Sequence, residues 1–317
     1  MATRVFLTID TAMAWRHHAA GLSGAEVARR SFDPAGVGIG YQLEMFARYG
    51  LKASFFVDPM SALVHGIAHV ARVVDEILIA GQEVQLHLNP GWSGADIDDR
   101  SRHDRFELSD YSAAEQRALI EQASDLLTTA GAPTPIAFRA GNYAANDDTL
   151  AALAALRFAY DSSHNGARHS EASAIPLPPR QIAPLARGGL TEVPVTLIED
   201  HAGMMRDFHL GAVSVAEMRA ALDHAARENH AAVTIAIPGA DLANCAGTAA
   251  NGLHVRRFEA LCVLLAEWAG QMPTTHFADR PPLRLDAADT PLGPDPRRTR
   301  WRQAEQLWST LVSGRAA

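Results

Sequence analysis

The sequence predicts an α/β protein with a mostly parallel sheet and helices on its outside. Seven short, β-rich apolar runs alternate with segments of helical periodicity along the 317 residues, and this alternation is typical of consecutive βα units. Hydrophobic residues make up 48% of the chain, which is enough for a large buried core. A single large α/β barrel fits these observations as well as two domains do.

The predicted strands are short and bounded by turn-forming residues. In order they are RVFLTI, KASFFV, EVQLHL, PIAFRA, FAYDS, LTEVPVTLI and AAVTIAI, at 4–9, 52–57, 83–88, 135–140, 158–162, 190–198 and 231–237. Pro, Ser and Gly are frequent between 164 and 189, so we expect a long connection there. We predict one barrel domain over residues 1–280 and a C-terminal extension over 281–317, whose stretch 302–312 has the pattern of a short helix.

Two helix starts and two helix ends are marked by local sequence. Serine followed three residues later by glutamate is the spacing of a capping box, and a glycine after an apolar periodic segment is a common helix stop. The boxes are Ser112 with Glu115 and Ser214 with Glu217, and the stops are Gly50 and Gly131. These positions predict helices directly after 112 and 214 and directly before 50 and 131.

Charge and composition argue against several classes of partner. The formal charge of −8 and the pI near 5.9 are unlike those of a nucleic-acid-binding protein, which needs clustered Lys and Arg. The first strand begins at once, without the pattern of a signal peptide, and there is no apolar run long enough to cross a membrane. Cys245 and Cys262 suit free thiols in a reducing compartment. We therefore expect a cytoplasmic protein with neither a nucleic-acid partner nor a membrane span.

Several predicted strands end in the same way, with a polar side chain directly after an apolar run. These residues are Asp10, His87, Arg139 and Asp161. In a parallel barrel the carboxyl ends of all strands meet at one rim, so we expect the four side chains to converge on one pocket. Each residue taken singly also has a structural interpretation, as a cap, a core histidine or an ion-pair partner.

Four motifs in this order resemble the polysaccharide deacetylase family, also called the NodB-homology domain or carbohydrate esterase family four. They are FLTIDT, EVQLHLNPGW, FRAGNYAAN and YDSS, within a resemblance that spans roughly residues 4 to 270. The resemblance implies a deformed (β/α)7 TIM-like barrel. It also implies hydrolysis of an N-acetyl group from an amino sugar or glycan precursor by water activated on a divalent metal, which can lower the pKa of water toward ~7.

The resemblance assigns roles to individual residues. Asp10 matches the catalytic base and is also an expected metal ligand, and His87 matches the first metal-binding histidine. Arg139 matches the arginine that aims the base, and Asp161 matches the aspartate that supports the site. The turns after the third and fourth strands are expected to carry the substrate-binding residues, which are Asn89, Trp92, Asn142 and Tyr143.

Three polar groups of the family pattern are replaced in this chain. No second acidic residue follows Asp10, where Thr11, Ala12 and Met13 stand, and the second metal histidine is replaced at Asn89 or Gly91. The last strand ends in Pro238 instead of a histidine. Catalytic zinc usually has three protein ligands. We therefore expect a weak divalent metal site, zinc first, with His209 as a further ligand. His17, His18 and His164 are the other candidates.

Three functions are compatible with this pattern. The first is a deacetylase-type hydrolase that acts on a small-molecule or oligosaccharide substrate. The second is a family member that has lost catalysis and binds carbohydrate, and the third is a hydrolase of another non-peptide C–N bond. All three share one fold, so the fold alone does not distinguish them.

Overall fold

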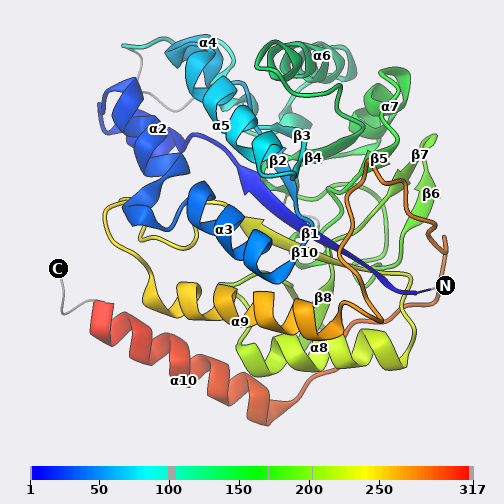
Figure 1. Cartoon of the computed structure of the whole chain (residues 1–317). Coiled ribbons are helices and arrows are strands. Elements are labelled where there is room, and N and C mark those ends of the chain that lie inside the picture. The colour runs from blue at the N-terminus through cyan, green and yellow to red at the C-terminus, as the bar shows by residue number, and fades with distance from the viewer. Residues whose placement is uncertain (1, 99–104, 170–171, 202, 314–317) are drawn as a thin grey trace.

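A curled, mostly parallel sheet forms the centre of the molecule (Figure 1). The computed structural model describes residues 2–98, 105–169, 172–201 and 203–313. The sheet has eight strands in the order β10-β1-β2-β3-β4-β5-β7-β6, and a separate hairpin joins β8 to β9. The strands are β1 (Arg4–Thr11), β2 (Ser54–Val57), β3 (Glu83–Leu88), β4 (Ala137–Ala140), β5 (Tyr160–Asp161), β6 (Leu185–Arg187), β7 (Leu190–Glu192), β8 (Leu197–His201), β9 (Met204–Asp207) and β10 (Ala232–Pro238).

Helices surround this sheet and connect its parallel strands (Figure 1). They are α1 (Trp15–Ala19), α2 (Gly24–Phe32), α3 (Ile39–Tyr49), α4 (Ala62–His65), α5 (Ala68–Ile79), α6 (Ala113–Thr129), α7 (Asp147–Ala155), α8 (Val215–Arg227), α9 (Gly252–Trp268) and α10 (Pro296–Ser313). The short 3-10 helices are η1 (Pro34–Gly36), η2 (Pro90–Trp92), η3 (Leu108–Asp110), η4 (Gly141–Tyr143) and η5 (Gly166–Arg168), of which η2, η4 and η5 come next after the strands β3, β4 and β5. Among the described residues, none of these helices combines the length and the apolar character that a bilayer crossing requires.

The predicted fold class is confirmed, in the form of a deformed barrel. All neighbouring strands of the sheet pair in parallel except β6 and β7. Within the described ranges no ladder joins β10 to β6, so the sheet curls without closing there. Both predicted capping boxes form, at the starts of α6 and α8. Gly50 ends α3 in a left-handed conformation, and Gly131 follows α6 with a positive φ.

The alternation of side chains along each strand separates two layers. On β1, Val5, Leu7 and Ile9 belong to the large core under the helices, whereas Phe6 belongs to a second cluster. That second cluster also contains Phe56 and Phe277, and the rings of Phe6 and Phe277 stack with centroids 4.5 Å apart. Because successive strand side chains point to opposite faces, the inner face of β1 continues through Thr8 to Asp10 at the rim. Apolar side chains therefore fill the interior of the curled sheet, and polar side chains lie at the rim where β1 ends.

The predicted sixth strand is wrong in its extent. We expected one strand over 190–198, but the structure has β7 up to Glu192 and β8 from Leu197. Pro194 lies in the gap, and proline has no N–H to donate to a sheet ladder. The chain leaves the sheet there, and β8 pairs with β9 as an antiparallel hairpin. The expected long connection before it also contains the short strand β6, which pairs with β7.

The C-terminal extension ends in a longer helix than the sequence predicted. We expected a helix over 302–312, and α10 begins already at Pro296. Arg302 is buried and donates to Asp200 Oδ1 at 3.1 Å, and its Nε lies 3.6 Å from Glu217 Oε1. The basic segment around Arg302 is therefore part of a packed helix. The boundary between residues 280 and 281 stays a prediction.

Candidate functional site

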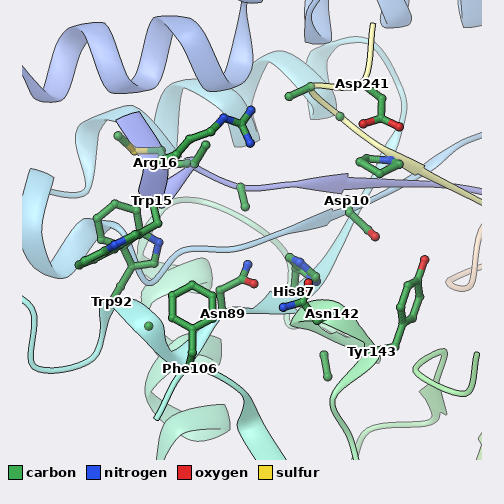
Figure 2. Close-up of a pocket in the computed structure, with 18 of the residues that line it drawn as sticks. Asp10, Trp15, Arg16, His87, Asn89, Trp92, Phe106, Asn142, Tyr143 and Asp241 are labelled. Atoms are coloured by element: carbon green, nitrogen blue, oxygen red, sulfur yellow. The ribbon is translucent and has the colours of Figure 1, made fainter. Parts of the chain in front are cut away.

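A cavity of about 500 Å³ opens at the rim where the parallel strands end (Figure 2). Its wall is built from the ends of β1, β3, β9 and β10 and from the turns that follow β3, β4 and β10. Seven residues of the predicted site line it: Asp10, His87, Asn89, Trp92, Asn142, Tyr143 and His209. The other two, Arg139 and Asp161, are completely buried outside the lining.

Asp10 is fixed by the buried guanidinium of Arg139. Arg139 Nη1 donates to Asp10 Oδ1 at 2.8 Å and to Thr8 Oγ1 at 2.7 Å. Its Nε and Nη2 donate to the carbonyl and hydroxyl oxygens of Ser162 at 3.0 and 2.8 Å. The side chain of Asp10 is 17% exposed and that of Arg139 is 0% exposed. A charge-assisted bond to a fully enclosed guanidinium is strong and directional. Arg139 therefore sets the orientation of the Asp10 carboxylate from behind the cavity wall.

His87 has one ring nitrogen engaged and one left for the cavity. Its ring lies in the wall near Asn89 and Asn142 (Figure 2). Nδ1 lies 2.9 Å from the carbonyl oxygen of Arg139, and because a carbonyl oxygen only accepts, Nδ1 carries the hydrogen when the ring is neutral. Nε2 is then the basic nitrogen. The parallel register that aligns His87 with Arg139 creates this contact.

Asp58 belongs to the site, and the sequence analysis missed it. It follows β2 directly, is 0% exposed, and its carboxylate accepts from Met60 N and from Asn89 Nδ2, both at 3.0 Å. Burial raises the pKa of Asp58, while the nearby His87 ring and these donors oppose the rise. Asp58 thus holds Asn89 in the wall beside His87. The signal was present in the sequence, because Asp58 follows its strand as Asp10 follows the first.

Gly141 allows Asn89 to occupy this position. A Cβ atom at Gly141 would lie 2.1 Å from Asn89 Oδ1 and 3.0 Å from the carbonyl oxygen of Leu88. We expect Gly141→Ala to displace Asn89 and to lower the free energy of unfolding by about 1–3 kcal/mol, the usual cost of overpacking. Urea unfolding measures this loss. Gly270→Ala is the matched control, because a Cβ there meets no atom within 4 Å. Equal effects of the two substitutions would contradict the tight Asn89–Gly141 contact.

His209, which follows the β8-β9 hairpin, is a second histidine that lines the cavity. His209 Nδ1 accepts from Gly211 N at 3.1 Å, and its Nε2 lies 3.4 Å from Asp207 Oδ1. Asp207 Oδ2 also accepts from Asn165 Nδ2 at 3.0 Å. Asp241, in the turn after β10, lines the cavity too, and burial raises the pKa of its carboxyl group. Neither aspartate was predicted, because Asp207 ends β9, a strand that was not expected from the sequence, and Asp241 lies three residues beyond the end of β10.

Tyr143 and Asn142 have backbone conformations that are rare for residues other than glycine. Their φ angles are +62° and +53°. Left-handed conformations of such residues cost free energy and are concentrated at functional sites. The turn brings the Tyr143 ring into the cavity wall (Figure 2), where the guanidinium carbon of Arg139 lies 5.9 Å from its centroid. Burial raises the pKa of the Tyr143 phenol, so the hydroxyl keeps its proton and is available as a donor.

One end of the cavity is aromatic. The rings of Trp15 and Trp92 meet at an angle of 65° with centroids 4.9 Å apart, and Phe106 lies next to them (Figure 2). Trp92 was predicted as a substrate-binding residue, whereas Trp15 and Phe106 were not. Neither residue directly follows a predicted strand, so the pattern that identified Asp10 and His87 did not identify them. The cavity therefore combines an apolar aromatic end with a polar end, as ligand pockets commonly do.

Asp161 is near the site, but its side chain is on the other side of the sheet from Arg139. It is aligned with Phe138, the neighbour of Arg139 on β4, and successive strand residues point to opposite faces. Its carboxylate accepts from the hydroxyl of Ser163 at 2.7 Å. The expectation that four strand-end side chains converge on one pocket therefore holds for Asp10 and His87, with Arg139 directly behind them. Asp161 does not line that pocket.

The donor set does not suit a catalytic metal. Among the described residues, no three His, Cys, Asp or Glu side chains are placed so that they could share a cation. Asp10 is engaged by Arg139, and His209 is engaged by Asp207 and Gly211. The cavity-lining residues also do not include His17, His18 or His164. The expected zinc site stays a prediction.

Comparisons with known proteins give structural matches only. No protein-family model and no curated protein matches the sequence. A protein from Mycobacterium smegmatis assigned as a polysaccharide deacetylase is 17% identical with a TM-score of 0.54, over 91% of this chain and 95% of that chain. A 4-α-glucanotransferase from Thermococcus litoralis is 9% identical with a TM-score of 0.53, over 88% of this chain and 40% of that chain.

A family 4 carbohydrate esterase from Streptomyces lividans, in complex with acetate, also matches, with 14% identity and a TM-score of 0.45 over 92% of this chain and 98% of that chain. At identities this low, the TM-scores of 0.54 and 0.53 show a shared fold and nothing about activity. The 4-α-glucanotransferase illustrates this, because an enzyme of that name carries out a different chemistry from that of a deacetylase. At the level of the fold, the resemblance read from the four motifs is confirmed. This chain has the fold of the polysaccharide deacetylases.

Proposed function

We propose that this protein is a hydrolase that removes an acyl group, N-acetyl first, from the nitrogen of an amino sugar or a related small polar amide. The observation that carries the proposal is the pairing of two groups in one cavity. They are the Asp10 carboxylate, held by Arg139, and His87, whose Nδ1 is engaged so that Nε2 is left as the base. The ion pair of Asp10 with Arg139 is buried at the cavity wall, and burial of such a pair costs stability. A function of Asp10 in the cavity explains why the pair is there.

The chain's own side chains can supply the proton transfers of amide hydrolysis. Nε2 of His87 takes a proton from the attacking water as the new C–O bond forms, and the ring then returns that proton to the departing nitrogen as the C–N bond breaks. Asp10 offers negative charge that stabilises the protonated ring. The Tyr143 hydroxyl, which keeps its proton, donates to the developing oxyanion. The aromatic end formed by Trp15 and Trp92 suits the apolar face of a sugar ring.

His87→Gln tests this assignment. We expect kcat to fall by about 10²–10⁴-fold, the usual contribution of a general acid–base group, with little change in unfolding midpoint. Release of free amine from a panel of N-acetylated sugars and cyclic amides measures the rate. His201→Gln is the matched control, because that side chain is 71% exposed. A His87→Gln protein that keeps the full rate would rule out His87 as the base.

Carbohydrate binding without catalysis is the second candidate function. It is favoured by the aromatic end of the cavity and by the lack, in the described part of the chain, of three side chains placed to hold a metal. Trp15 lines the cavity, so sugar binding is expected to change tryptophan fluorescence. Saturable binding of N-acetylated sugars with no amine released, even at high enzyme concentration, would favour this candidate over hydrolysis.

A further inference from the structure

Two carboxyl groups, Asp161 and Glu192, are buried together beside the site and have no part in the proposed reaction. They are aligned partners in the parallel pairing of β5 with β7, and both residues are 0% exposed. Their carboxyl groups are in contact. Two ionised carboxylates cannot lie in contact in a buried site without a strong repulsion, so such a pair retains a proton.

The charges around this pair do not neutralise two anions. Arg139 is a cation that acts on both carboxyl groups, and it forms its ion pair with Asp10. The other groups that bond to the pair are uncharged: Ser163 donates to Asp161 through its N–H and its hydroxyl, and the N–H of His164 donates to Glu192 Oε1 at 2.9 Å. Glu192 Oε2 receives no hydrogen bond in the described part of the chain. Burial raises the pKa of Glu192 well above its ordinary value, and the Asp161 charge adds to the rise.

A residue next to these carboxyl groups binds the side chain of Arg139. Ser162 follows Asp161 directly and accepts from Arg139 at both its carbonyl and its hydroxyl oxygen. The same hydroxyl donates to the carbonyl of Val193 at 2.8 Å, and Val193 follows Glu192. Ser162, which accepts from Arg139, and Val193, which accepts from Ser162, are thus the immediate neighbours of the carboxyl pair.

The backbone at Arg139 is held through the same segment. The hydroxyl of Ser163, which donates to Asp161, accepts from the N–H of Ala140 at 3.0 Å. The carbonyl of Arg139, which belongs to the same peptide group as that N–H, is the partner of His87 Nδ1. Any movement of β5 against β7 therefore reaches Asp10 through the guanidinium and His87 through the carbonyl.

We propose that Asp161 and Glu192 share one proton and act as a positioning pair, which fastens β5 to β7 so that Arg139 aims Asp10 and orients His87. The effect of this pair on catalysis rests on the proposed hydrolysis, whereas the shared proton does not depend on it. Loss of the proton leaves two adjacent anions, which repel and separate the strands at Ser162 and Val193. The site then loses its alignment as the pH rises.

The shared proton is tested without any substrate. Unfolding midpoints in urea are measured from about pH 5 to about pH 9 for the unmodified chain and Glu192→Gln, with Glu44→Gln, an exposed position, as the control. Because the folded pKa of Glu192 lies above the unfolded value of about 4.3, its stabilising contribution is complete below that value and is lost as pH rises through the folded one. We expect the midpoint of the unmodified chain and of Glu44→Gln to fall with rising pH relative to Glu192→Gln. Parallel curves for all three proteins would overturn the shared proton.

The positioning role is tested by rate. Glu192→Leu removes the donor, and we expect it to lower kcat by ~10–100-fold, the usual cost of a small misalignment, with KM little changed. Glu192→Gln keeps a donor toward Asp161 and is expected to restore the rate and to remove the alkaline decline in kcat. Equal rates for the two variants would overturn the positioning role. If the unmodified chain hydrolyses no substrate, the proposed function fails, whereas the unfolding experiment still decides the shared proton.

Discussion

Arg139→Met is expected to lower the free energy of unfolding by about 3–5 kcal/mol, the usual loss when one partner of a buried ion pair is removed. The substitution leaves Asp10 without its counter-charge and removes donors from Thr8 Oγ1 and from both oxygens of Ser162. Methionine fills much of the same volume, so packing accounts for little of the loss. Hydrolysis is expected to disappear with it. Urea unfolding and amine release measure the two effects on one preparation.

The control for Arg139→Met is Arg187→Met. Arg187 pairs with Asp147 at 3.0 Å, but these side chains are 31% and 62% exposed, and a pair open to solvent contributes about 0–1 kcal/mol. The contrast isolates burial as the cause, since both substitutions break one arginine–aspartate pair. Similar losses in the two variants would contradict the structural role given to Arg139.

The double substitution Ala12→Asp with Asn89→His is expected to install a metal site. Both positions line the cavity beside His87, so the variant would offer one carboxylate and two imidazoles, the ligand number usual for catalytic zinc. Asp58 already accepts a hydrogen bond from residue 89 and can accept one from the imidazole, as outer carboxylates commonly do for metal-bound histidines. We expect zinc to bind on the order of 10²–10⁴-fold more tightly than to the unmodified chain, taking roughly 10–100-fold for each added group. Calorimetric titration with zinc measures this.

The control for the metal site is the double substitution Ala12→Asp with Asn89→Gln, which adds the carboxylate but no second imidazole. It is expected to bind zinc little better than the unmodified chain does. The structure also favours position 89 over position 91 for the introduced histidine. A Cβ at Gly91 would lie 2.7 Å from Phe106 Cε2, so a histidine there is expected to disturb the aromatic end. Tight zinc binding by the unmodified chain would show instead that other residues, His209 first, complete a site.

Sequence reasoning succeeded where the cause of a structure is local. The capping boxes at Ser112 and Ser214 and the stop at Gly50 need only the residues within one or two helical turns. The strand over 190–198 failed because its apolar run was given more weight than Pro194, which cannot donate to a ladder. Asp58 was missed although it obeyed the strand-end rule, since the apolar run before it was not followed one residue further.

The order of strands and helices, and the positions of Asp10, His87 and Arg139 at strand ends, could be predicted from the sequence. Neighbouring residues suffice to show a hydrophobic period of two or of about 3.6. Which of these side chains share a cavity depends instead on contacts between distant parts of the chain. Arg139 and Thr8 are 131 positions apart, and their bond depends on the inner faces of β1 and β4 turning toward each other. Asp161 obeys the same strand-end rule, yet it lies on the opposite face and pairs with Glu192. A strand end fixes the rim at which a residue lies, whereas its face depends on a register with distant strands that no local pattern contains.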